Sequence, residues 1–159
     1  MPDRPSKPQP LLQAQVFVSL LRAADALARA GEELLKPAGL TGAQYNVLRI
    51  LQGAGAAGLA CNEVGCRLIA RDPDITRLLD RMESRGLISR ARQKYDRRVV
   101  KTFITAKGTE MLAALENAVE ELHRKQFRRL SRKEQHTLWQ LLERTRGEAD
   151  SPEDEARDQ

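Results

Sequence analysis

The sequence predicts a mainly α-helical domain that carries one small β-hairpin and has a long helix at each end. Three observations predict this class. Apolar residues recur at helical spacing over most of residues 11–146. The pattern becomes strand-like only between residues 87 and 104, and two capping boxes mark helix starts. A chain of 159 residues, 41% hydrophobic and 31% charged, has the size and composition of a single globular domain.

The first predicted helix covers residues 11–36 and is followed by a second that starts at Thr41. Apolar residues of the first helix recur at intervals of three, four and seven, and Pro37 and Gly39 end it. Thr41 and Gln44 form a capping box, and the glycines between residues 53 and 58 break the second helix. Residues 1–10 hold four prolines and are predicted to be a flexible, extended arm.

Two short helices come next. One runs from about Cys61 to Leu68. The other is predicted to start with Asp72 as the N-cap and Pro73 at the first helical position. Gly86 is expected just after its end, since glycine readily adopts the left-handed conformation that closes a helix. The side chains expected on its buried face are Ile75, Leu78, Leu79 and Met82.

The hairpin and the last two helices complete the domain. Residues 87–92 and 99–104 predict two strands joined by a polar, charged connection. Thr105 is expected to cap a long helix that reaches about Leu130, and Ser131 with Glu134 forms a second capping box. Residues 147–159 hold six acidic residues and no hydrophobic side chain larger than alanine, which predicts a disordered acidic tail.

The excess positive charge lies in the short helices and the hairpin. Residues 67–101 carry 11 basic and 5 acidic residues, a net charge of +6, whereas the rest carries 16 basic and 17 acidic residues, a net charge of −1. A solvated charged face is one interpretation, and phosphate contact is the other. An α-helix fits the major groove of B-DNA, and a neighbouring hairpin can reach the minor groove. The order of elements is that of a winged helix-turn-helix that binds duplex DNA.

Several segments resemble the MarR (multiple antibiotic resistance regulator) family, and together they span about residues 11–146. Residues 75–88, ITRLLDRMESRGLI, resemble the family's recognition helix, and residues 96–98, DRR, resemble its wing-tip motif. Residues 104–108, ITAKG, resemble the junction after the wing. GLT followed by QYNVL from residue 39, and LSRKE from residue 130, resemble the entries to the second and last helices.

The resemblance implies a homodimeric transcriptional regulator that binds double-stranded DNA. Residues 11–36 and 106–146 would be the dimerisation helices, and residues 41–105 the winged lobe that binds a pseudo-palindromic operator. The resemblance also implies repression that a small aromatic or phenolic ligand relieves. It implies no cofactor.

The resemblance also identifies candidate contacts to DNA. Thr76 and Arg77 match positions of the recognition helix that face the groove. Asp96 and Arg98 match a wing pair in which the carboxylate orients the arginine toward the minor groove. The remaining candidates are cations of the hairpin that would add phosphate or groove contacts. The full predicted set is Thr76, Arg77, Arg92, Lys94, Asp96, Arg97 and Arg98.

Charged residues of the recognition helix also have structural interpretations. Arg77 can pair instead with Asp74 or Asp80, each three residues away on the same helix. Asp74 can accept a hydrogen bond from cytosine N4 or stabilise the helix N-terminus, and the second interpretation is favoured. Arg81 and Arg85 are as consistent with solvated or ion-paired surface residues as with contacts to DNA.

Other kinds of site are disfavoured. Cys61 and Cys66 form no CxxC pair and are interpreted as structural or incidental, with a thiol switch on the same scaffold as the alternative. His123 and His136 lack a second ligand at metal-binding spacing, so no metal site is expected. No catalytic motif is present, so the chain is not expected to be an enzyme. The other alternative is a protein-interaction module that does not bind DNA.

Two further expectations concern location and the last helix. No secretory signal, membrane-spanning stretch or disulfide framework is present, which predicts a cytoplasmic protein that does not contact membranes. Trp139 lies on the amphipathic last helix. It is expected in the core or the dimer interface, with the wall of a ligand pocket as the alternative.

Overall fold

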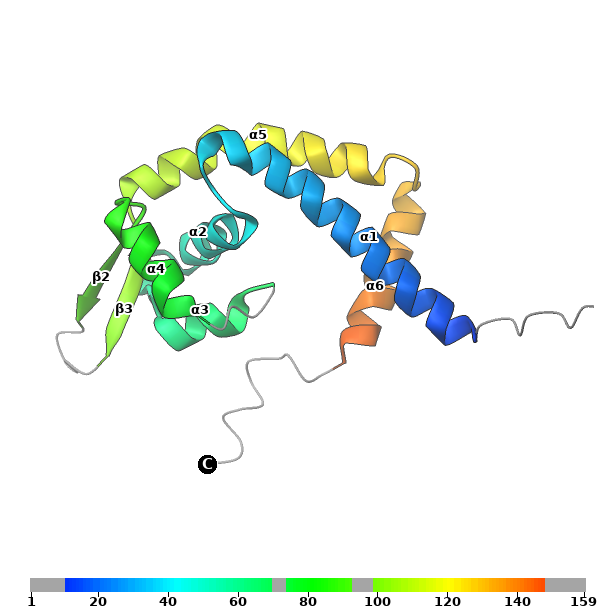
Figure 1. The fold of residues 1–159 in the computed structure, drawn as a ribbon, viewed down its shortest axis with the longest axis horizontal. Coiled ribbons are helices and arrows are strands. Elements are labelled where there is room, and N and C mark those ends of the chain that lie inside the picture. The colour runs from blue at the N-terminus through cyan, green and yellow to red at the C-terminus, as the bar shows by residue number, and fades with distance from the viewer. Residues whose placement is uncertain (1–10, 70–73, 93–98, 148–159) are drawn as a thin grey trace, which may run out of the picture. The chain divides into compact units, whose positions relative to one another are not determined.

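A computed structural model describes residues 11–69, 74–92 and 99–147 of the chain (Figure 1). The mainly helical fold with a small β-sheet is confirmed. The chain divides into two compact units, Met1–Glu120 and Glu121–Gln159, with the division inside one long helix. The elements are α1 (Leu12–Leu35), the 3₁₀ turn η1 (Lys36–Ala38), α2 (Gly42–Ala54), the 3₁₀ turn η2 (Gly55–Ala57), β1 (Leu59–Ala60), α3 (Cys61–Arg67), α4 (Ile75–Ser84), β2 (Ile88–Arg92), β3 (Val100–Ile104), α5 (Ala106–Phe127) and α6 (Arg132–Arg146).

Both predicted capping boxes are present. Thr41 Oγ1 accepts a hydrogen bond from the Gln44 main-chain N at 3.2 Å, and Gln44 Oε1 accepts one from the Thr41 N at 3.2 Å. At α6, Ser131 Oγ accepts from the Glu134 N at 3.3 Å, and Glu134 Oε2 accepts from the Ser131 N at 2.7 Å. Hydrogen bonds from the Ser131 side chain and main chain lower the pKa of the Glu134 carboxyl. These bonds satisfy main-chain donors that a helix start leaves unpaired.

The predicted hairpin is present, but it belongs to a sheet of three antiparallel strands in the order β1-β3-β2. Strand β1, in which Leu59 pairs with Thr102 and Ala60 with Lys101, was not predicted from the sequence. A strand of two residues is too short to show an alternating pattern. Gly58 allows this pairing because its φ is +57° and a Cβ there would lie 2.4 Å from the Phe103 ring.

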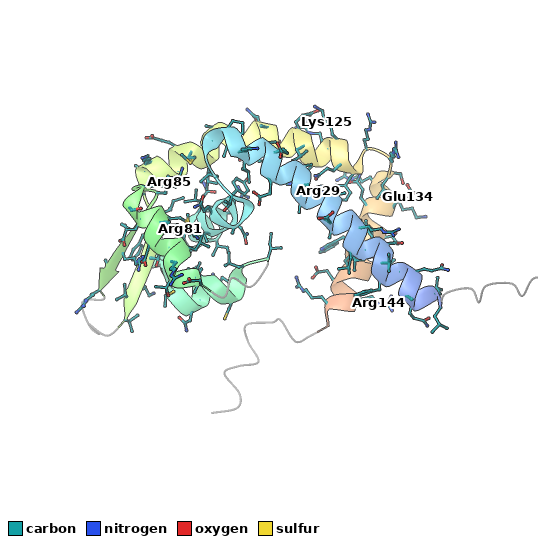
Figure 2. The ribbon with its side chains drawn as sticks, viewed as in Figure 1. Arg29, Arg81, Arg85, Lys125, Glu134 and Arg144 are labelled. Atoms are coloured by element: carbon teal, nitrogen blue, oxygen red, sulfur yellow. The ribbon has the colours of Figure 1, made fainter. Side chains whose placement is uncertain are left out.

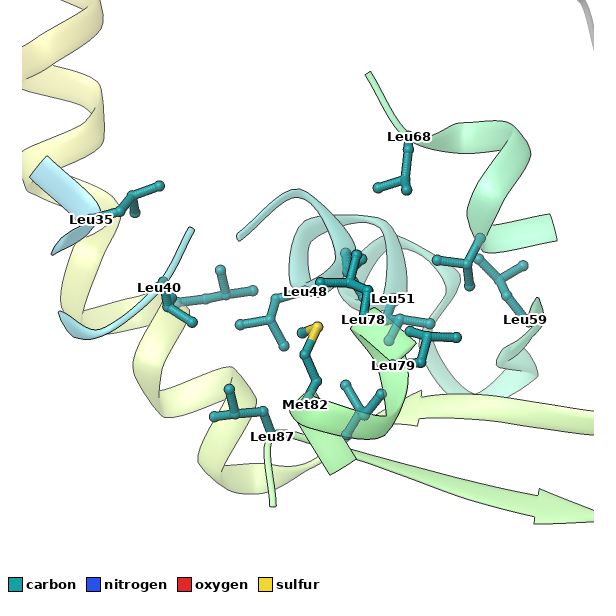
Figure 3. Packing of buried hydrophobic residues seen from close by; sticks show 14 residues of the cluster. Leu35, Leu40, Leu48, Leu51, Leu59, Leu68, Leu78, Leu79, Met82 and Leu87 are labelled. Atoms are coloured by element: carbon teal, nitrogen blue, oxygen red, sulfur yellow. The ribbon is translucent and has the colours of Figure 1, made fainter. Parts of the chain in front are cut away.

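The core of the first unit lies beneath α4 (Figure 3). Leu78, Leu79 and Met82 of α4 pack into one cluster with Leu48 and Leu51 of α2, so the predicted buried face of α4 is confirmed. Ile75 is only half-buried. Because one face of α4 is anchored in the core, its opposite face is presented to solvent.

The start of α4 differs from the prediction. The N-cap is Asp74, whose Oδ1 accepts a hydrogen bond from the Arg77 main-chain N at 3.3 Å, and the helix begins at Ile75. The predicted cap at Asp72 is therefore wrong, although Asp72 and Pro73 themselves lie outside the described residues. Two aspartates two residues apart are both competent caps, and the cap at Asp74 places the apolar Ile75 directly at the first helical position.

Of two other predicted helix ends, one is where it was expected and one is not. The end of α4 at Gly86 is as predicted, with φ +71°, whereas α5 ends at Phe127, short of the predicted Leu130. The predicted arm (residues 1–10) and the acidic tail beyond Gly147 lie outside the described residues. Among the helices that the structure describes, none has a stretch long and apolar enough to cross a bilayer.

Candidate nucleic-acid interface

The outer face of α4 is polar and exposed. It lies opposite the buried Leu78, Leu79 and Met82. Both predicted groove-facing residues, Thr76 and Arg77, are on it. Figure 2 labels Arg81 on the same helix. The α4 outer face consists of Thr76, Arg77, Asp80, Arg81 and Ser84, all exposed.

Arg77 is held by an ion pair on its own helix. Its Nε lies 3.0 Å from Asp74 Oδ2, and the two side chains are 81% and 46% exposed. The pairing with Asp74 considered from the sequence therefore forms. An ion pair this exposed contributes at most about 1 kcal/mol, so Arg77 can exchange Asp74 for another partner at little cost. Asp74 caps the helix, which agrees with the favoured helix-stabilising interpretation of that residue.

Thr76 lies beside one of the two cysteines. The Thr76 Oγ1 and Cys61 Sγ atoms are 4.0 Å apart. Cys61 is half-buried and packs against the core, whereas Cys66 is exposed. In the part of the chain that the structure describes, both cysteines are free thiols.

The hairpin carries one further predicted contact that the structure describes, Arg92. Side chains alternate along a strand, so Arg92 projects from the same face of β2 as Ile88 and Arg90. Arg92 is exposed, and it pairs with Val100 across the sheet. The other predicted hairpin contacts lie outside the described residues, and they are Lys94, Asp96, Arg97 and Arg98.

Arg90 contacts α4 in a way that was not predicted from the sequence. Its guanidinium pairs with Asp80 of α4, and its Nε lies 3.2 Å from Glu83 Oε2. Asp80 therefore does not pair with Arg77, the second pairing considered from the sequence. The available signal was two acidic residues one helical turn apart on α4, followed by an arginine on the core-facing side of the next strand.

Arg85 is bound to the chain and is not a freely solvated side chain. Its Nη1 donates hydrogen bonds to the Gly39 carbonyl oxygen at 2.7 Å and to Gln44 Oε1 at 3.3 Å. Lys107 Nζ donates to the Arg85 carbonyl oxygen at 2.8 Å. These contacts tie the end of α4 to the loop before α2 and to α5, where Figure 2 labels Arg85. Neither interpretation of Arg85 from the sequence included main-chain acceptors.

No metal centre is found in the described residues. Within residues 11–69, 74–92 and 99–147, no three His, Cys, Asp or Glu side chains gather closely enough to hold an ion. The candidate interface consists of an exposed helix face and a hairpin strand that both carry arginines.

Comparison with known proteins identifies the family of this arrangement. Residues 40–100 match the model of the MarR family. A crystal structure of a MarR transcription factor from Planctomyces limnophilus is 35% identical, with a TM-score of 0.64 over 86% of this chain and 98% of that one. The chain belongs to the MarR family of transcriptional regulators. This result confirms the resemblance on which the site prediction depends.

Two further similarities bear on function. The HTH-type transcriptional regulator TtmR from Methylorubrum extorquens is 39% identical over 97 residues, which are 61% of this chain and 49% of TtmR. The chain thus matches about half the length of that relative. A mutant MarR from Escherichia coli, solved in complex with operator DNA, is 26% identical, with a TM-score of 0.74 over 86% of this chain and 99% of that one. Because the relatives are transcription regulators, the expectation that the chain is not an enzyme is confirmed.

Proposed function

We propose that the chain is a homodimeric transcriptional repressor that binds a pseudo-palindromic operator with α4 and the β2–β3 hairpin. The observation that carries the proposal is the α4 outer face, which is exposed and cationic at Arg77 and Arg81 while the opposite face is fixed in the core. The major groove of B-DNA admits a helix of this kind. Arg92 extends the cationic surface onto the adjacent strand.

The proposed contacts divide between the two grooves. Thr76 and Arg77 reach base edges, and a bidentate contact from Arg77 to guanine O6 and N7 would contribute about 1–3 kcal/mol of discrimination. That gain exceeds the cost of breaking the exposed pair with Asp74, which is at most about 1 kcal/mol. Arg92, Lys94 and Arg97 would contact phosphate or the minor groove. Asp96 would orient Arg98 into the minor groove.

The terminal helices support pairing with a second copy. On α1, Phe17 is 61% exposed, and on α6, Trp139 is 58% exposed. Trp139, expected in the core or at the dimer interface, is thus absent from the core of its own chain. Monomeric proteins rarely expose such apolar faces, and a twofold dimer would cover them and match the symmetry of a palindrome. The other large exposed apolar residues on these helices are Leu12, Val16, Val18, Leu20, Leu21, Leu138, Leu141 and Leu142.

Regulation follows from occupancy of the operator. A dimer bound over a promoter excludes RNA polymerase, and a small aromatic or phenolic ligand would release it. Family membership supports both parts of this proposal. The relatives named above are bacterial, and a protein that binds operators in bacteria works in the cytoplasm, where the chromosome lies.

Selection of duplexes from a random pool tests the proposal without knowledge of the operator. The wild-type protein is mixed with duplexes of about 30 base pairs, long enough for two half-sites. The affinity for the enriched duplex is then measured by fluorescence anisotropy. Arg77→Ala should lose about tenfold or more in affinity. The matched control is Arg49→Ala, because Arg49 is also an exposed helical arginine and lies outside both the proposed DNA contacts and the helices proposed for the dimer.

The outcomes separate the proposal from its alternatives. The proposal is supported if the protein enriches a specific duplex and its affinity falls steeply with salt. It is further supported if only Arg77→Ala loses affinity. A protein-interaction module would enrich no duplex and show no salt-dependent affinity. Equal losses in the two variants would contradict the assignment of α4 as the element that contacts bases.

A further inference from the structure

One residue of the hairpin, Arg90, contacts the recognition helix through both its side chain and its main chain. The guanidinium pairs with Asp80, and Nε lies 3.2 Å from Glu83 Oε2. The other oxygen of the same carboxylate, Glu83 Oε1, accepts a hydrogen bond from the Arg90 main-chain N at 3.0 Å. Strand β2 is therefore joined to α4 at two carboxylates that lie one helical turn apart.

The Arg90 side chain is enclosed, whereas Arg77, Arg81 and Arg92 are exposed. It is 23% exposed, against 81% for Arg77. Its Nε atom is buried and makes no hydrogen bond, so its contact with Glu83 Oε2 at 3.2 Å is an attraction between charges. Its partner across the sheet is Thr102, which is 1% exposed. Water screens a partly buried ion pair less than an exposed one, and loss of one partner leaves the other charge poorly compensated. The carboxylates of Asp80 and Glu83 are themselves 56% and 42% exposed, so the ion pairs are only partly shielded from water. The main-chain hydrogen bond from Arg90 to Glu83 adds to them and makes the link between β2 and α4 stiffer than a single surface ion pair.

The link lies where two DNA-binding elements must keep a fixed spacing. The α4 outer face carries Arg77, and β2 carries Arg92 two residues beyond Arg90 on the same strand face. A helix and a hairpin that engage neighbouring grooves at once bind more tightly when their separation is set before binding, because less conformational freedom is lost. The guanidinium of Arg90 is already engaged by α4 and needs no contact with DNA to have this effect.

We propose that Arg90 is a positioning residue for DNA binding, which fixes the hairpin against α4 so that both elements engage the duplex together. The inference rests on the proposed function. It assigns to Asp80 and Glu83 a role in DNA binding although both are acidic. Electrostatics alone predicts the opposite, since removal of two carboxylates near DNA should strengthen phosphate binding.

The two explanations predict opposite changes in DNA affinity when the carboxylates are removed, and this difference can be tested. Duplexes are selected from the random pool with the wild-type protein, with Arg90→Ala and with the double variant Asp80→Asn/Glu83→Gln. The matched control is Arg49→Ala, which removes an exposed arginine of α2 that lies outside both the proposed DNA contacts and the helices proposed for the dimer. Thermal melting reports whether each variant folds. If Arg90→Ala does not fold, Arg90→Lys replaces it, because lysine keeps the positive charge but lacks the planar guanidinium group.

Both the Arg90 variant and the double variant should keep the bases that α4 selects in each half-site. Both should lose the preference at flanking positions, where a hairpin reads minor-groove width. Their affinity for the wild-type duplex should fall about tenfold, the size of one lost specific contact. The control should match the wild type in motif and affinity.

Three results would overturn the inference. One is that the duplexes selected by the wild-type protein show no base preference at the flanking positions. Another is an Arg90 variant that keeps the wild-type motif. The third is a double variant that binds the wild-type duplex more tightly and keeps the preference at the flanking positions. That result would mean that Arg90 contacts DNA itself. If the wild-type protein enriches no duplex at all, the proposed function fails, and that failure is distinct from these three.

Discussion

Substitution of Asp74 separates a helix cap from a base contact. Asp74 Oδ1 accepts a hydrogen bond from the Arg77 main-chain N at 3.3 Å, and Asp74 Oδ2 lies 3.0 Å from Arg77 Nε. Asp74→Ala removes both interactions. Asp74→Asn removes the negative charge but keeps an oxygen that can cap the helix, and asparagine is as good an N-cap as aspartate.

The size of each effect follows from the exposure of the groups. Loss of an N-cap costs about 1 kcal/mol, and the pair between Asp74 and Arg77, 46% and 81% exposed, adds only a few tenths. Asp74→Ala should therefore lower the melting temperature by about 2–4 °C for a chain of this size. Asp74→Asn should stay within about 0.5 kcal/mol of the wild type because its cap remains.

The two variants should behave differently toward DNA. With one carboxylate fewer near phosphate and Arg77 released, Asp74→Asn should bind the selected duplex about twofold more tightly at low salt. Anisotropy measures the affinity, and circular dichroism follows melting at one fixed protein concentration, since dimer stability depends on concentration. A tenfold loss of affinity in Asp74→Asn with unchanged melting would refute this reasoning, since it would show that the carboxylate reads a base.

Three further substitutions and one deletion test the packing, the dimer and the hairpin. Gly108→Ala should destabilise the fold by about 1–3 kcal/mol, because a Cβ there would lie 2.4 Å from the Leu87 carbonyl oxygen. Gly31→Ala, which meets nothing within 4 Å, should be neutral or stabilising by up to about 1 kcal/mol; urea denaturation that reverses this order would contradict the packing. Deletion of residues 1–20 removes much of the apolar face of α1 and should yield monomers in sedimentation, and a dimeric product would count against that interface. Arg98→Ala should weaken operator binding about tenfold with little change in melting, and wild-type affinity would remove Arg98 from the proposed contacts.

Features set by local sequence were predictable. The capping boxes at Thr41 and Ser131 depend on residues three positions apart, and both formed as expected. The buried face of α4 followed from the spacing of Leu78, Leu79 and Met82. These elements depend on neighbours along the chain, so the sequence pattern contains the information that determines them.

Features set by distant contacts were not predictable from one sequence. Arg85 donates to the carbonyl oxygen of Gly39, 46 residues earlier, and β1 exists because Leu59 pairs with Thr102. The role of Arg90 requires knowledge of how β2 lies against α4. The choice of Asp74 over Asp72 as the cap was ambiguous because both carboxylates can cap a helix.

Methylation interference on the selected duplex tests most directly the claim that α4 and the hairpin engage adjacent grooves. Dimethyl sulfate modifies guanine N7, which lies in the major groove, and adenine N3, which lies in the minor groove. Binding should be blocked by N7 methylation inside each of two symmetric half-sites and by N3 methylation at their flanks. Binding that tolerates methylation at both positions, or interference in one unpaired site, would contradict the account.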